Sequence, residues 1–176
     1  DRLDQAINIL GAVAETGVEE LPTDHTFAEL RGPGSGEILA SRILEVDSER
    51  RDLVDERNRL QRELERWAPW GELNPDVLED LAERGLELHL VQLSADQESL
   101  LAEVDYVVAG RDRREVRALI VGHPGSIPVL SPPGSSVPAL RARETEVSAR
   151  IAQIDADLGT AASLLPHLEA SRAEVE

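Results

Sequence analysis

The residues best suited to acid–base or metal chemistry are the four histidines, and their spacing argues against a shared site. None of them belongs to an H-E-x-x-H pattern or to another spacing typical of metal ligands. An isolated histidine is most often a solvated side chain. We therefore expect no metal site and no catalytic histidine. The four are His25, His89, His123 and His167.

The remaining candidate groups are also isolated in the sequence. Asp155 and Asp157 form an acidic pair, but side chains two residues apart point to different sides of a helix and do not easily share an ion. Ser94, Ser131 and Ser136 have no G-x-S-x-G pattern around them. The sequence therefore predicts a protein that is not an enzyme and that has no cofactor.

The charge of the chain restricts its partners. The formal net charge is -17, with 35 acidic residues against 18 basic ones. Nucleic acid and anionic membrane surfaces would mostly repel such a chain, so we expect neither as a partner. There is no cysteine for a disulfide or a thiolate metal site. No stretch approaches the roughly 20 apolar residues of a membrane span, and no signal peptide is recognisable.

The first 36 residues predict a short helix followed by a loop. Leu3, Ile7 and Leu10 repeat at helical spacing over 1–17, and Gly17 is a plausible stop. The segment 18–36 is interrupted by proline and glycine, and its glycines lack the Lys and Ser or Thr of a phosphate-binding loop. We expect a loop there, with one turn over 27–30 and Ser35 capping the next helix.

A long helix is predicted over 37–67, about 45 Å in length. Its core positions alternate steps of four and three, the spacing that keeps one stripe facing a partner helix. Arg50 and Arg57 fall on this stripe. They either fix the pairing register from a buried position or lie half-covered with their charges in water, and we favour the second interpretation. The stripe comprises Leu39, Ile43, Val46, Arg50, Leu53, Arg57, Leu60, Leu64 and Trp67.

A structural joint is predicted at the end of this helix, at Trp67, Pro69, Trp70 and Gly71. Pro69 cannot donate the helical hydrogen bond, and Gly71 permits a sharp turn. The two tryptophans either mark a binding surface or pack as a plug between helix and lobe. We favour packing because a tryptophan buries a large area.

Residues 68–135 predict a small α/β lobe of βαββ order. Asn74 and Pro75 begin a helix over 75–84 that Gly85 ends. Alternating leucines over 86–93 indicate a strand with one covered face. Ser94 to Gln97 reads as a capping box that opens a helix through Leu101. The runs 104–109 and 116–121 indicate a hairpin around a charged turn.

A returning coiled-coil helix is predicted over 136–176, with Gly159 and Pro166 as points where it bends. Residues 1–67 and 136–176 then form two arms around the lobe. The predicted fold class is α+β, a long antiparallel coiled-coil hairpin capped by the lobe, with its termini close together. Because the chain lacks methionine and both ends fall within helical patterns, we expect it to be part of a longer protein.

In its order of elements the chain resembles the cytoplasmic region of subunit I of V-type (A/V-type) rotary ATPases, the homologue of eukaryotic subunit a. The resemblance covers about 37–168. It rests on the long helix, Pro69-Trp70-Gly71, the helix and strand of 72–93, the hairpin, the proline-rich segment 130–136 and the returning helix. It implies a distal lobe with coiled-coil arms, followed in the full subunit by a membrane domain.

The resemblance also implies the role and the partners. The chain would be a stator component of a proton or sodium ATPase, on the cytoplasmic side of the membrane within an integral membrane complex. It would anchor the peripheral stalk E and G subunits, and other stator or central-stalk collar subunits are further candidate partners. We expect its acidic surface to favour basic residues on the stalk.

The sequence is also compatible with two other classes of protein. One is a coiled-coil hairpin that dimerises or tethers, as in chromosome-maintenance proteins, with the lobe contacting its own copy. The other is an enzyme with a coiled-coil handle, which requires a pocket of convergent polar groups that the sequence does not indicate.

Overall fold

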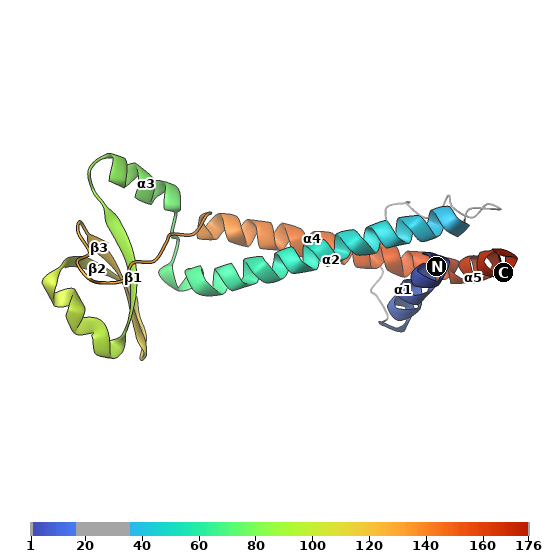
Figure 1. Cartoon of the computed structure of the whole chain (residues 1–176), viewed down its shortest axis with the longest axis horizontal. Coiled ribbons are helices and arrows are strands. Elements are labelled where there is room, and N and C mark those ends of the chain that lie inside the picture. The colour runs from blue at the N-terminus through green and yellow to red at the C-terminus, as the bar shows by residue number, and fades with distance from the viewer. Residues whose placement is uncertain (1, 17–35, 176) are drawn as a thin grey trace. The chain divides into compact units, whose positions relative to one another are not determined.

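The computed structural model describes residues 2–16 and 36–175 (Figure 1). The predicted loop 18–36 with its turn over 27–30, and the roles given to Gly17, Ser35 and His25, lie outside these residues, apart from Gly36. The chain divides into two compact units. The helical unit comprises Asp1–Asn58 and Thr145–Glu176, and the sheet unit comprises Arg59–Glu144.

The helical unit packs several helices around one apolar core. Helix α1 spans Arg2–Thr16, and α2 spans Gly36–Trp67, of which the part up to Asn58 belongs to this unit. Both lie within one residue of the predicted bounds. The core joins α1, α2 and the C-terminal helices through Leu3, Ala6, Leu10, Leu39, Ala40, Ile43, Val46, Ile154, Leu158, Ala161, Leu164 and Leu168.

The C-terminal segment is interrupted, whereas the sequence predicted one returning helix that bends. Helix α4 spans Val137–Ala161, a 3-10 turn η3 spans Ala162–Leu164, and α5 spans Leu165–Val175. Pro166 explains the interruption, because a proline within an α-helix removes one hydrogen bond and its ring clashes with the preceding turn. In the first turn of a new helix the same residue is tolerated. Helix α1 lies against α5, and Arg172 pairs with Asp4 at 3.2 Å.

The sheet unit begins with the last turns of α2 and a 3-10 turn η1, Ala68–Trp70. Helix α3 follows at Pro75–Glu83 with the predicted cap, because the Asn74 side chain accepts a hydrogen bond from the backbone of Asp76 at 3.1 Å. Gly85, at φ 85°, ends the turn after the helix, as its position predicted.

Three antiparallel strands form the sheet, in the order β1-β3-β2. Strand β1 spans Leu88–Ser94, β2 spans Asp105–Arg111 and β3 spans Glu115–Val121. The predicted hairpin is confirmed as the β2–β3 pair, with a register shift between Val108 and Gly110. Strand β3 therefore lies between its two neighbours.

Both faces of this sheet are covered, so the expected strand with one covered face is wrong. Leu90 and Leu119 are paired across β1 and β3, and they face a core that contains Trp67, Trp70 and Val137. The alternate residues face a second core, formed by Val91, Leu93, Leu101, Val116, Ala118, Ile120 and Ile127. The expectation failed because the apolar positions of β1 change face after Leu90: Leu88 and Leu90 share one alternation, whereas Val91 and Leu93 lie on the other.

The element between β1 and β2 differs from the prediction. It is a 3-10 helix, η2, over Ala95–Glu103, and not an α-helix through Leu101. The capping box is not formed, because the Ser94 hydroxyl contacts Gln97 Oε1 at 2.9 Å and does not cap the backbone. Leu101 is fully buried in the core beneath β1 and β3. We infer that burial of Leu101 determines the course of this connection more than local propensity does.

Candidate functional site

The predicted joint forms a packed cluster in the sheet unit. Trp67 is 3% exposed and Trp70 is 7% exposed. Their ring centroids lie 6.2 Å apart with the planes tilted by 47°. Leu90 of β1 and Val137 of α4 complete the buried cluster, and partly buried leucines surround it. The cluster therefore joins the end of α2, the start of α4 and one face of the sheet, the arrangement expected of packing tryptophans.

The backbone turns at Gly71 after the tryptophans. Pro69 lies within η1, and the Gly71 N–H donates to the Ala68 carbonyl at 3.0 Å. Gly71 has φ 78° and ψ -143°, a conformation that other residues adopt only with strain. The Pro69 carbonyl lies beside β2, since a Cβ built on Gly110 would be 3.4 Å from it. The joint is thus held against the β2–β3 end of the sheet.

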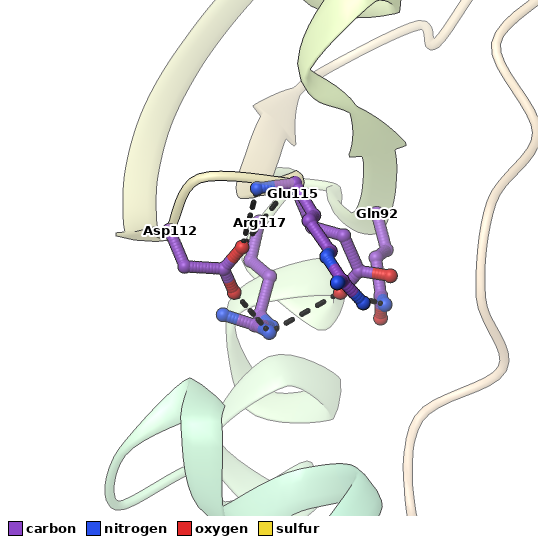
Figure 2. A network of polar contacts seen from close by, with 5 residues as sticks. Gln92, Asp112, Glu115 and Arg117 are labelled. Carbon is purple, nitrogen blue, oxygen red and sulfur yellow. Dashed lines mark hydrogen bonds and ion pairs between the residues drawn. The ribbon is translucent and has the colours of Figure 1, made fainter.

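A polar network not predicted from the sequence closes the β2–β3 turn. Figure 2 shows Arg117 between the carboxylates of Asp112 and Glu115, at 3.1 and 3.3 Å. The Arg117 side chain is 13% exposed. Gln92 of β1 donates to Glu115 at 2.7 Å and ties the turn to the neighbouring strand.

The Asp112 side chain stabilises this turn by binding the backbone of the residues that follow it. Its Oδ1 accepts hydrogen bonds from the backbone N–H groups of Arg114 at 2.8 Å and Glu115 at 3.0 Å. These N–H donors, Arg114 first, hold the pKa of Asp112 below its usual value because they stabilise the ionised carboxylate. A side-chain oxygen that accepts a hydrogen bond from the backbone N–H two residues later forms an Asx-turn, and aspartate is a residue that favours this turn. Asp112 is therefore the one sequence signal that could have indicated the network in advance.

Strand β2 leaves an exposed apolar edge. It pairs with β3 alone among the described strands, and Tyr106, Val107 and Val108 are 40, 59 and 42% exposed. The opposite edge of the sheet is covered, because the Leu130 N–H donates to the Leu90 carbonyl at 2.7 Å. An open edge with β-branched residues is able to accept a strand from another chain.

The candidate chemical residues are not brought together. His89 lies in β1, His123 follows β3 with its Nδ1 accepting the Gly125 N–H at 2.9 Å, and His167 lies in α5. Asp155 pairs with Arg50, whereas Asp157 accepts from Gln153 at 3.0 Å. Within residues 2–16 and 36–175, no three His, Asp or Glu side chains are grouped as metal ligands.

The serines singled out from the sequence lie at ends of elements. Ser94 ends β1, and Ser136 precedes α4, where its hydroxyl accepts the Ala139 N–H at 3.3 Å. That bond is an N-cap at the position where the returning helix was predicted to begin. Ser131 lies in the proline-rich segment between β3 and α4 and is exposed.

Arg50 and Arg57 occupy half-buried positions on α2 within the helical unit. The Arg50 side chain is 39% exposed, which fits the favoured interpretation of a half-covered stripe, yet Arg50 also pairs with Asp155 of α4 at 2.5 Å. The Arg57 Nε is buried and has no hydrogen-bond partner among the described residues. Arg50 therefore combines features of both interpretations, since it is partly solvated and also links two helices.

No described helix combines the length and the apolar character that crossing a bilayer requires. The sequence was compared with known protein families, with curated proteins and with solved structures, and no match was found in any of the three.

Proposed function

We propose that this chain is a non-catalytic stator element, the distal lobe and arms of the cytoplasmic region of a V-type ATPase subunit I. The order of elements supports the proposal: a long helix, the Pro-Trp-Gly turn, a short helix, a strand, a hairpin, a proline-rich segment and a second long helix. This is the order on which the resemblance rests. The parent protein would be membrane-embedded, on the cytoplasmic side, within a rotary proton or sodium ATPase.

The observation that carries the proposal is the tryptophan cluster. Trp67 and Trp70 join α2, α4 and the sheet within one compact unit. A stator must transmit torque, and a lobe packed on both of its helices deforms less than one attached through loops.

The proposal includes an antiparallel coiled-coil pair formed by α2 and α4. In the helical unit Arg50 pairs with Asp155, and in the sheet unit Gln61 donates to Glu144 at 3.2 Å. From Arg50 to Gln61, and from Asp155 back to Glu144, the step is eleven residues in each helix. Eleven residues are about three helical turns, so one face of each helix serves both contacts.

Pairs of spin labels test this arrangement. The chain has no cysteine, so introduced cysteines can be labelled without background. We expect short distances for Ser48→Cys with Ala152→Cys, and also for Glu65→Cys with Ala139→Cys, because packed helices lie about 8–10 Å apart. All four side chains are exposed. A short distance for one pair and a long or broad one for the other would contradict a continuous antiparallel pair.

The proposed partners are the peripheral stalk E and G subunits, docked on the sheet unit and the adjoining helix turns. The net charge of -17 supports steering of basic residues on the stalk toward this chain. Titration of E–G binding against NaCl tests the steering. We expect the association rate to fall as salt rises, and an association rate independent of salt would exclude electrostatic steering.

The exposed edge of β2 favours a second candidate function, a tethering module that pairs with its own copy. Tyr106, Val107 and Val108 offer an apolar strand to an antiparallel partner. Light scattering over a range of concentrations distinguishes the two functions. A dimer that Val107→Lys disrupts would support the tethering module, whereas a monomer at all concentrations would support the stator.

A further inference from the structure

A groove in the sheet unit has the opposite charge to the chain as a whole. It has a volume of about 670 Å³ and lies between the last turns of α2 and the segment 129–134. Arg59, Arg62 and Arg66 line it together with Glu63. Three guanidinium groups thus face one carboxylate in a protein whose net charge is -17.

The three arginines form a row along one helix face. They are spaced by three and four residues, so their side chains lie above one another over about 10.5 Å. None of the three has an ion pair with another described residue, whereas Arg50, Arg117 and Arg141 all have one. Their hydrogen-bond donors are therefore available to an external acceptor.

The helix side of the groove is ordered by an aromatic contact. The Arg66 guanidinium carbon lies 4.9 Å from the centroid of the Trp67 ring. Trp67 itself is 3% exposed and belongs to the buried cluster. A cation held over a fixed indole loses less conformational entropy when a ligand binds.

The opposite wall is also fixed in place. The Leu130 N–H donates to the Leu90 carbonyl at 2.7 Å, and the Val137 N–H donates to the Leu73 carbonyl at 3.1 Å. Pro132 and Pro133 lie between these two attachments and restrict φ. Val129, 48% exposed, supplies an apolar surface to the groove. Both walls are thus in place before any ligand arrives.

We propose that this groove binds an acidic segment of a partner protein in an extended conformation. Alternate side chains of an extended chain are about 6.6 Å apart, so two or three carboxylates match the length of the arginine row. Each guanidinium can donate two parallel hydrogen bonds to a carboxylate. An aliphatic side chain of the segment contacts Val129.

The shape and charge of the site distinguish this ligand from other anions. A single phosphate would engage one end of a row that extends over about 10.5 Å. A nucleic acid would bring many phosphates against the acidic remainder of the chain. In the proposed stator role, basic residues of the partner bind the acidic surface of this chain. The arginine groove is independent of that role, so an experiment can exclude either proposal without excluding the other.

Binding of a synthetic peptide, Glu-Val-Glu-Val-Glu-Val, tests the proposal at low salt. Trp67 lines the groove, so its fluorescence reports occupancy, and Trp70→Phe leaves it as the single indole. Isothermal titration calorimetry gives the affinity independently. Inorganic phosphate and single-stranded oligo-dT are the competing ligands.

The decisive variant is Arg59→Gln/Arg62→Gln. Its matched control is Arg84→Gln/Arg113→Gln, which changes the net charge equally at exposed positions away from the groove. We expect the groove variant to weaken peptide binding at least about tenfold at an unchanged melting temperature, and the control to leave binding unchanged. Equal weakening in both variants, no peptide binding, or phosphate or oligo-dT binding as tight as the peptide would overturn the proposal.

Discussion

Arg50 Nε in α2 lies 2.5 Å from Asp155 Oδ1 in α4, 105 residues away along the chain. Nearby, Arg150 of α4 pairs with Glu49 of α2 at 2.8 Å. Two reciprocal ion pairs across the same helix contact favour one longitudinal alignment, because a shift by one residue would separate the charges. The apolar core of the helical unit provides the larger stabilisation, and the ion pairs select its register.

A double-mutant cycle measures the coupling between these two residues. We expect Arg50→Met and Asp155→Leu to show an interaction free energy of about 0.2–1 kcal/mol, because both side chains are about one-third exposed and solvent screens the pair. Denaturant unfolding provides the values. The exposed pair Arg42–Glu45 within α2 is the control and should couple less strongly. Equal coupling in the two cycles would remove the argument for register selection.

Truncation of Trp70 tests the packed joint. We expect Trp70→Ala to lower the free energy of unfolding by about 3–5 kcal/mol, because it leaves a cavity between η1, β1 and α4. Trp70→Phe should cost much less, since the buried indole Nε1 has no hydrogen-bond partner among the described residues. Tyr106→Ala, at an exposed position in the same unit, is the control. A melting temperature unchanged by Trp70→Ala would show that the indole is not packed.

Gly71 provides a test of backbone conformation alone. A Cβ at this position would meet nothing within 4 Å, so the cost of Gly71→Ala comes from φ 78°. We expect a loss of about 1–3 kcal/mol, because φ 78° combined with ψ -143° is a region that essentially only glycine occupies. Gly134→Ala is a matched loop substitution that also meets no atom and has no positive φ, and it should be neutral or slightly stabilising. The same thermal shift for both substitutions would contradict the strained turn.

Asp112 gives the chain a pH-dependent contribution to stability. Its pKa is lowered in the folded state, so its contribution is present above the unfolded value near 3.8 and is lost as the pH falls through the folded pKa. We expect Asp112→Asn to lower the melting temperature at pH 7, with the difference from the parent chain shrinking below pH 3.8. Asp76→Asn, at an exposed α3 position, is the control. A difference that grows as the pH falls would have the wrong sign for this mechanism.

The sequence predicted elements whose signals are local. Asn74, Pro75 and Gly85 lie within a dozen residues of one another and determine the bounds of α3, while β-branched runs indicate the β2–β3 pair. Tertiary contacts decided the rest. Leu101 is drawn into the core as part of a 3-10 helix, and β1 is covered on both faces because α2 and α4 reach one of them.

The arginine groove depends on residues that no local pattern connects. From the sequence alone, the spacing of Arg59, Arg62 and Arg66 indicates only a solvated helix face, because arginine is common on exposed helix surfaces. They line a groove since the segment 129–134, more than sixty residues later, is held beside α2 by the bond between Leu130 and Leu90. Such a site is recognisable only after the fold has been determined.

The proposed stator role is tested most directly by mixing this chain with a purified E–G stalk heterodimer from the same complex and measuring the mass by sedimentation. We predict a complex of defined stoichiometry that Trp70→Ala weakens, because that variant loosens the lobe on its helices. The role would be contradicted if the heterodimer sediments unchanged in the presence of this chain at concentrations well above those at which a specific complex forms.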